Sequence, residues 1–96
     1  MPQIVWTPEA LTDVQRLFRF LAAHNLNTAR RAINAIREGV NILELHPWSG
    51  RPVEEKTDDY KEWPIKFGNS GYVVLYRIEK NQVPILSVRH QKEAGW

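Results

Sequence analysis

The sequence has no cysteine, a single methionine and no long apolar run. Without cysteine, the chain can form neither a disulfide nor a thiolate metal site. This usage fits a reducing compartment, and we expect a cytoplasmic protein. No apolar stretch approaches the roughly 20 residues that a membrane-spanning helix needs. The first ten residues also lack the charged-then-apolar pattern of a secretory signal.

Motifs of the common enzyme classes are also missing. The sequence contains no glycine-rich phosphate loop, no Ser/His/Asp arrangement and no zinc signature. Neither His46 nor His90 stands at metal-ligand spacing from another histidine or a carboxylate. We therefore expect no metal ion and no cofactor.

The length and the charge distribution suit one small binding domain. Ninety-six residues, of which 43% are hydrophobic and 25% charged, predict a single domain over residues 1–96. The net charge is only +2, yet residues 60–96 contain six basic and three acidic side chains. A locally basic surface suits a polyanion or an acidic protein partner. A solvated surface that happens to be basic is the plain alternative.

The first half of the sequence predicts a short strand and two helices. Residues 3–6 (QIVW) form an apolar strand, after which Thr7 is a good N-cap and Pro8 suits the first helical position. Apolar residues at three- and four-residue spacing predict one helix to about His24 and another over residues 28–45.

The two helices are expected to pack as an antiparallel hairpin, because only residues 25–27 link them. Asn27 is the predicted N-cap of the second helix. Gly39, in the middle of that helix, is interpreted as a place where the first helix approaches closely. In the link that follows, Trp48 is expected to form a lid on the edge of the core, and residues 53–59 a mobile polar loop.

The second half predicts an antiparallel meander. Three segments are rich in β-branched and aromatic residues and are bounded by turn residues: 63–67, 72–78 and 83–88.

Strict alternation assigns the two faces of this sheet. If Trp63, Ile65 and Phe67 point toward the helices, Lys66 points away from them. On the other strands, the expected core residues are Tyr72, Val74, Tyr76, Ile78, Leu86 and Val88. The outer face then carries Lys66, Val73, Leu75, Arg77, Ile85, Ser87 and Arg89, with His90, Gln91 and Lys92 at its end. A slip of one residue would invert these assignments.

This outer face mixes apolar and basic side chains, and a monomer rarely leaves such a patch bare. We expect a partner segment to cover it. Cover by the chain's own residues 95–96 is the alternative.

Three segments in a fixed order carry a resemblance to a known family. They are HPWSGRPV (46–53), GYVVLYRI (71–78) and VRHQKEAGW (88–96). With the strand and the helix hairpin before them, the chain resembles the RelE/ParE superfamily of toxins from bacterial type II toxin–antitoxin modules. The resemblance covers essentially the whole chain. It implies an α+β fold, in which an N-terminal strand precedes an antiparallel helix hairpin packed on a twisted, mostly antiparallel four-stranded sheet.

The superfamily contains two activities. The RelE-like branch cleaves mRNA on the ribosome without a metal, and the resemblance carries its catalytic lysine to Lys66. His90 could act as a general acid or base, and either Gln91 or Lys92 occupies the region where the resemblance implies a C-terminal arginine. The arginine expected after the SGY motif is absent, because Val73 stands there, and Trp96 replaces the terminal tyrosine.

The ParE-like branch inhibits DNA gyrase and needs no catalytic residues of its own. The GRP turn and the uninterrupted helix hairpin resemble this branch more closely, so we expect a non-enzymatic toxin directed at gyrase. An mRNA interferase, acting on ribosome and mRNA, is the first alternative, and a non-toxic binding module of the same fold is the second.

The resemblance also implies a cognate antitoxin, with a segment that folds on the toxin when it binds. Its expected contacts are Val73, Leu75, Arg77, Ile85 and Arg89.

Overall fold

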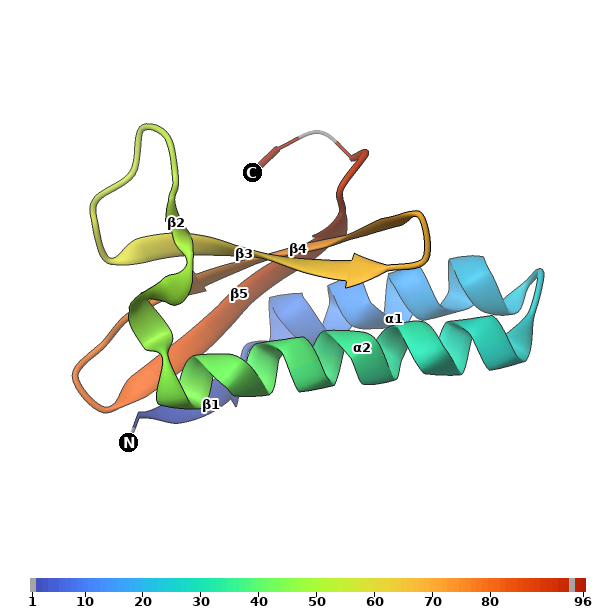
Figure 1. Cartoon of the computed structure of the whole chain (residues 1–96), viewed down its shortest axis with the longest axis horizontal. Coiled ribbons are helices and arrows are strands. Elements are labelled where there is room, and N and C mark those ends of the chain that lie inside the picture. The colour runs from blue at the N-terminus through green and yellow to red at the C-terminus, as the bar shows by residue number, and fades with distance from the viewer. Residues whose placement is uncertain (1, 94) are drawn as a thin grey trace.

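In the computed structural model, which describes residues 2–93 and 95–96, a pair of helices lies against one face of a five-stranded sheet (Figure 1). The elements in chain order are β1 (Gln3–Trp6), α1 (Pro8–Ala22), α2 (Leu26–Leu45), the 3₁₀ turn η1 (Pro47–Ser49), β2 (Arg51–Pro52), β3 (Tyr60–Phe67), β4 (Ser70–Arg77) and β5 (Gln82–His90). Within the described ranges, no helix is long and apolar enough to span a bilayer. The predicted α+β class is confirmed.

Side-chain caps start both helices. Thr7 Oγ1 accepts a hydrogen bond from the Ala10 backbone N–H (3.2 Å), as expected for the N-cap of α1. Asn25 Oδ1 accepts one from the Thr28 N–H (3.0 Å) and so caps α2. The predicted N-cap Asn27 was therefore wrong. Asn25 has the extended backbone that an N-cap needs, and Asn27 already lies inside the helix.

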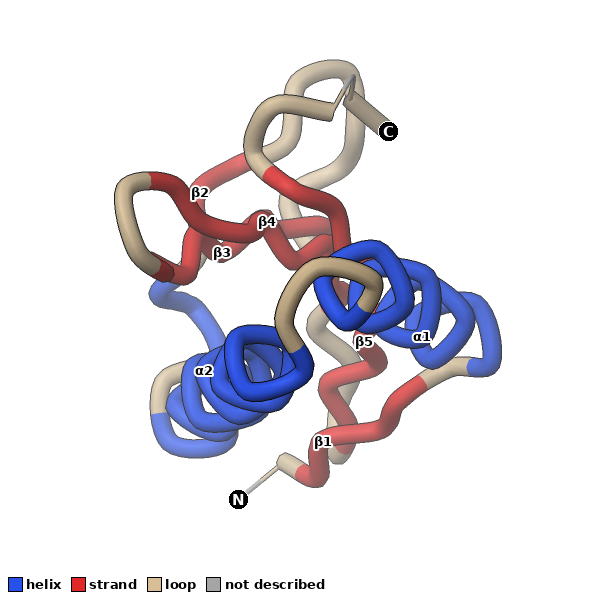
Figure 2. Tube along the Cα trace, turned by 90° about the vertical axis from the view of Figure 1, so that its right-hand side faces the viewer, coloured by secondary structure: helices blue, strands red, loops and turns tan. Residues whose placement is uncertain are grey.

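The strand order is β1-β5-β4-β3-β2. β1 pairs parallel with β5, and all other neighbours are antiparallel. Figure 2 shows the sheet in end view, with β1 and β2 far apart. The expectation of four strands missed β2, because two residues that include a proline give no strand pattern. β3 also begins at Tyr60 rather than at Trp63.

A two-residue turn joins β3 to β4. Phe67 pairs with Ser70, so only Gly68 and Asn69 lie between the strands. Gly68 has a φ of 60°. A positive φ at the first central position is the geometry of a type II′ turn, which matches the twist of a hairpin and favours glycine.

A bulge in β5 changes which residues face the helices. Leu75 pairs with Ser87, but Tyr76 pairs with Ile85, so Leu86 is the extra residue. Ile85 and Val88 are both fully buried, whereas Leu86 is half-buried. The predicted core position of Leu86 and outer position of Ile85 were therefore wrong. The one extra residue inverts the alternation in the first part of the strand.

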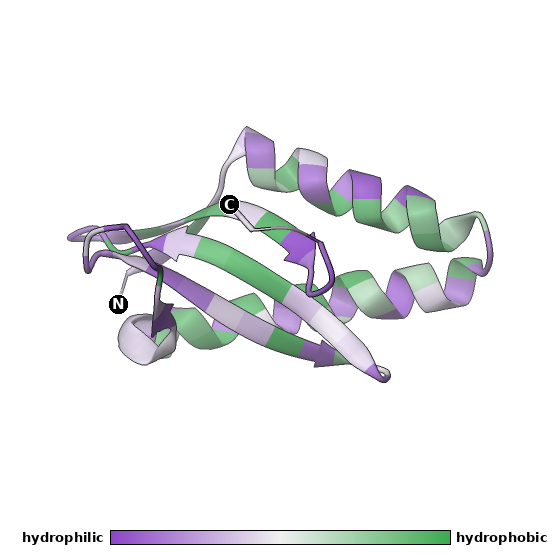
Figure 3. Ribbon diagram, turned by 90° about the horizontal axis from the view of Figure 1, so that it is seen from above, coloured by the Kyte–Doolittle hydropathy of each residue, from purple (hydrophilic) through white to green (hydrophobic). Residues whose placement is uncertain are grey.

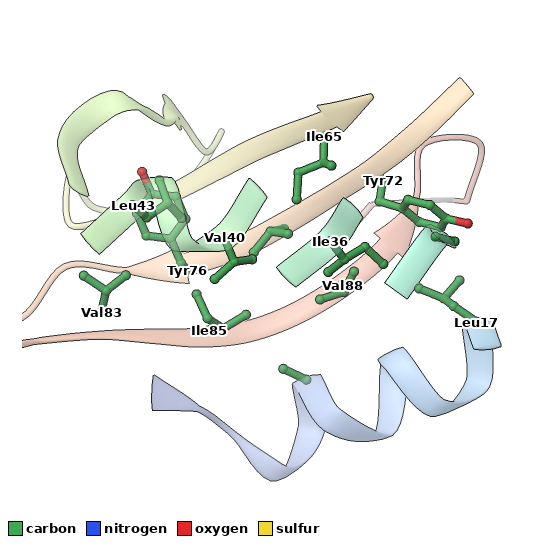
Figure 4. Packing of buried hydrophobic residues seen from close by; sticks show 13 residues of the cluster. Leu17, Ile36, Val40, Leu43, Ile65, Tyr72, Tyr76, Val83, Ile85 and Val88 are labelled. Atoms are coloured by element: carbon green, nitrogen blue, oxygen red, sulfur yellow. The ribbon is translucent and has the colours of Figure 1, made fainter. Parts of the chain in front are cut away.

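The core lies between the helix pair and the inner face of the sheet (Figure 4). Tyr76 is fully buried there, and its hydroxyl donates to the Pro47 carbonyl (2.7 Å) and accepts from the Gly50 N–H (2.9 Å). These two bonds fix η1 against β4. The two hydrogen bonds hold the backbone of η1, whereas Trp48 in the middle of η1 is 63% exposed and does not cover the core. The predicted lid was therefore wrong.

Gly39 allows β3, not α1, to approach α2. A Cβ at this position would lie 2.7 Å from the Ile65 Cδ1 atom. Trp63 Nε1 also donates to the Gly39 carbonyl (3.0 Å). The close approach was predicted, but its partner was wrong, because α2 turns this side toward the sheet.

Candidate functional site

The outer face of the sheet is the first candidate site. The hairpin register places Lys66, Val73 and Leu75 on it, because each alternates with a residue that faces the helices. Arg77 and Arg89 follow from the same register. Figure 3 looks onto this face and shows a hydrophobic stretch along β4 beside the more hydrophilic β3.

The apolar centre of the outer face is not open. Val73 and Leu75 are only 4% and 8% exposed. Figure 1 shows the C-terminal segment passing over this side of the sheet, away from the helices.

Trp96 spans the outer side of β4. Its Nε1 donates to Glu62 Oε2 (3.0 Å) on β3, and the guanidinium of Arg89 on β5 lies 4.7 Å from the centre of its ring. Glu62 pairs with Leu75, and Arg89 pairs with Val73. The indole therefore lies across the two apolar residues of β4. Cover by residues 95–96, the alternative in the sequence analysis, is what the structure has.

These positions correct three of the predicted contacts. Ile85 has no exposed surface and packs in the core, so it cannot meet a partner. Val73 and Leu75 were expected to be open, but the chain's own C-terminal residues cover them.

The two arginines of the outer face are bound within the chain. Arg77 pairs with Asp59 (3.2 Å) and Glu79 (3.5 Å). Arg89 Nη1 donates to the carbonyls of His90, Gln91 and Glu93, the last at 3.0 Å. Arg89 thus holds the start of the C-terminal segment, and Arg77 holds the end of β4.

Ionised Glu62 is stabilised by the same arrangement. Burial alone would raise its pKa, but hydrogen bonds from Trp96 and Arg51 and the positive charges of Arg51 and Arg89 outweigh burial. The net result is a pKa below the ordinary value. The carboxylate that holds Trp96 therefore stays charged around neutral pH.

The three residues that the RelE-like alternative would need do not share a face. Lys66 is exposed on the outer face. His90 pairs with Tyr72, which belongs to the core cluster, so its ring lies on the helix side. Lys92 is exposed in the segment after β5, where its backbone N–H donates to His90 Nδ1 (3.2 Å).

His90 belongs to a small polar and aromatic group on the helix side. Its Nε2 lies 3.0 Å from Ser70 Oγ, and its ring meets Tyr72 edge-on at 5.5 Å. The Lys92 N–H occupies Nδ1, so the proton of the neutral ring is on Nε2 and is donated to Ser70. In this arrangement His90 is a hydrogen-bond donor and does not activate Ser70 as a base.

A pocket of about 540 Å³ opens beside this group. One wall comes from the second half of α1, and the other from the β3–β4 turn and the end of β5. Its lining residues are Arg16, Leu17, Phe20, Leu21, Phe67, Gly68, Asn69, Ser70, Tyr72, His90 and Glu93. Within the part of the chain that the structure describes, no cluster of three or more His, Asp or Glu residues could hold a metal ion.

The sequence analysis did not identify the residues that organise the outer face and the helix-side pocket. Glu62 and Trp96 are 34 positions apart, and Arg16 and Glu93 are 77 apart, although the latter pair meets at 2.9 Å. None of these contacts leaves a local pattern, so no signal in the single sequence could have identified them.

Comparison with known proteins gives consistent results. Residues 4–95 match the family described as "ParE toxin of type II toxin-antitoxin system, parDE". The chain is 32% identical over 93 residues to "Toxin RelE3" of Caulobacter vibrioides, with 97% of this chain and 98% of that protein covered. A solved structure, "Chromosomal ParDE TA system from P. aeruginosa", has the same fold, with a TM-score of 0.74 at 19% identity over 94% of this chain and 96% of the other.

The family match spans nearly the whole chain, and the fold agrees with it. The protein belongs to the ParE toxin family, within the RelE/ParE superfamily of type II toxin–antitoxin toxins.

Proposed function

We propose that this toxin inhibits growth in the ParE-like way, by binding DNA gyrase in the cytoplasm, and that it breaks no bond itself. The observation that carries the proposal is the separation of Lys66 and His90 on opposite faces of the sheet. Cleavage of RNA through the 2′-hydroxyl needs an acid, a base and cations around one phosphate. Here His90, the predicted acid or base, donates to Ser70 on the helix side.

Two assays on the purified chain distinguish gyrase from the ribosome. Inhibition of supercoiling by gyrase, or cleaved DNA trapped on it, is the expected result. Primer extension on mRNA translated in a cell-free system should show no new ends. Cuts at fixed codon positions would establish the mRNA interferase instead. No effect in either assay would leave the non-toxic binding module.

A double variant gives an independent test in cells. Lys66→Ala combined with His90→Gln should arrest growth as strongly as the unchanged chain. Loss of a general acid–base pair costs an enzyme about 10²–10⁴-fold in rate, so an interferase would lose its toxicity. Lys80→Ala, which removes an exposed lysine from the β4–β5 turn, is the matched control. Glutamine at position 90 retains an N–H for Ser70, which limits any effect on the fold.

The family implies a cognate antitoxin, and the outer face is its proposed docking surface. Its segment would replace Trp96 over Val73 and Leu75, and its acidic residues would meet Arg77 and Arg89. Reversal of both arginine charges to Glu should weaken binding of the antitoxin at least about tenfold at moderate salt.

Lys80→Glu controls for the change in net charge, and Arg77→Glu alone separates partner binding from the role of Arg89 in holding the C-terminal segment. Unchanged affinity in the double variant would remove this surface from the proposal. Growth after induced expression, with and without the neighbouring reading frame, tests whether that frame encodes the antitoxin.

A further inference from the structure

The helix-side pocket has the size and composition of a small-molecule site. Its volume of about 540 Å³ lies within the range of roughly 300–1,000 Å³ found for ligand pockets. Most of its surface is apolar, although it opens to solvent. The aromatic ring of Phe20, at its rim, is 70% exposed and so does not fill it.

Three rings from adjacent strands form one wall of the pocket. Phe67 ends β3, Tyr72 lies on β4 and His90 ends β5. The ring centres of Phe67 and Tyr72 are 6.2 Å apart, and those of Tyr72 and His90 are 5.5 Å apart. The opposite wall is aliphatic, with Leu17 and Leu21 from α1. A slot between an aromatic and an aliphatic wall favours a flat apolar group.

The polar groups around the slot mainly donate hydrogen bonds. Because His90 donates to Ser70 Oγ, the hydroxyl proton of Ser70 is free to point elsewhere. Figure 4 shows the Tyr72 hydroxyl directed beyond the core, near Leu17. Burial raises the pKa of Tyr72, so its hydroxyl stays protonated. The guanidinium of Arg16 completes this group of donors.

Arg16 already holds an acidic group of the chain. Its two terminal nitrogens lie 2.9 and 3.5 Å from the carboxylate oxygens of Glu93, which also lines the pocket. The pair is on the surface, with both side chains more than a third exposed, so its net strength is small. A carboxylate on a ligand can therefore share or replace Glu93 at Arg16.

From these four observations we propose that the pocket binds a small aromatic carboxylic acid. Its ring lies between the aromatic wall and α1, and its carboxylate accepts hydrogen bonds from Ser70 and Arg16. The site is separate from the outer face, and it does not depend on whether gyrase or the ribosome is the target of the toxin.

Naphthalene-2-carboxylate is a suitable probe, because it combines a flat apolar body with one anionic end. Titration into the full ¹⁵N-labelled chain should shift the amide resonances of the β3–β4 turn and of His90. A ligand of this size can reach a Kd of about 1 mM or lower. Naphthalene-2-carboxamide, which has the same shape and no charge, should bind at least about fivefold more weakly.

Variants on α1 test the geometry. Arg16→Gln should weaken naphthalene-2-carboxylate about fivefold and leave the carboxamide unchanged, whereas Arg19→Gln, an exposed neighbour outside the pocket, should affect neither. Leu21→Trp should fill the slot and abolish binding. Since Arg16 is on the surface, its variant keeps the test valid even if Leu21→Trp does not fold. Shifts outside the pocket, no binding at 5 mM probe (roughly fivefold above the expected Kd), or equal affinity for acid and amide would overturn the proposal.

Discussion

Removal of the Tyr76 hydroxyl should destabilise the protein far more than removal of the Tyr72 hydroxyl. Tyr76 is fully buried, and its hydroxyl serves two backbone groups at once: it donates to the Pro47 carbonyl and accepts from the Gly50 N–H. In Tyr76→Phe both backbone groups lose their partner, and Gly50 is itself buried. One hydrogen bond contributes about 1 kcal/mol, and a buried group left without a partner costs about 1–3 kcal/mol. Two partners therefore predict a loss of about 2–3 kcal/mol in the free energy of unfolding.

Tyr72→Phe is the matched control, because it deletes the same atom from the same sheet. No hydrogen bond of the Tyr72 hydroxyl to another described residue is present, so the expected loss is below about 0.5 kcal/mol. Denaturant unfolding measures both values. In a chain of this length, the Tyr76 variant should also melt about 10–20 °C lower. Equal stabilities for the two variants would refute the argument that η1 is held by this hydroxyl.

Three further outcomes follow from single contacts. Asp13→Ala should lower the free energy of unfolding by about 2 kcal/mol, because Asp13 Oδ2 accepts a hydrogen bond from the Val88 N–H (2.9 Å) beyond the end of β1. Asp13→Asn keeps an acceptor oxygen and should cost less; equal losses for the two variants would contradict this. Gly39→Ala should cost about 1–2 kcal/mol despite its better helix propensity, since the new methyl group meets β3; increased stability in the same unfolding assay would contradict it. The pKa of Glu62 in the folded state lies below its ordinary value of 4.5. Ionised Glu62 therefore stabilises the fold fully above pH 4.5, and this stabilisation is lost as the pH falls through the folded-state pKa. The indole N–H resonance of Trp96 should therefore shift on acidification below pH 4.5, and should not do so in Glu62→Gln.

The sequence predicted what depends on local pattern. The helix hairpin follows from apolar spacing, and the start of α1 from Thr7 and Pro8. It could not predict the bulge at Leu86, because an extra residue is defined only by the pairing with β4. Alternation counted from Val88 therefore assigned Ile85 to the wrong face.

The site was harder to predict than the fold for the same reason. Lys66, Arg77 and Arg89 were correctly placed on the outer face, because each lies in a stretch of strand where alternation is unbroken. What covers that face depends on Trp96 meeting residues far away in the sequence, and no periodicity reports such a contact. Composition alone therefore left open whether the outer face is exposed or covered by the chain itself, because the answer depends on long-range contacts.

The end of β5 connects the two faces of the sheet. Arg89 points to the outer face and binds the carbonyl of Glu93, while the Glu93 side chain accepts from the His90 N–H (2.7 Å) and from Arg16 on the helix side. Arg89 and His90, which are consecutive on β5, thus hold residues 91–93 from opposite sides. Residue 93 precedes Trp96 by only three positions, so we expect a partner that displaces the indole from the outer face to disturb the contacts of Glu93 beside the pocket. The surface proposed for the antitoxin and the pocket proposed for a small acid are therefore linked through one short stretch of backbone.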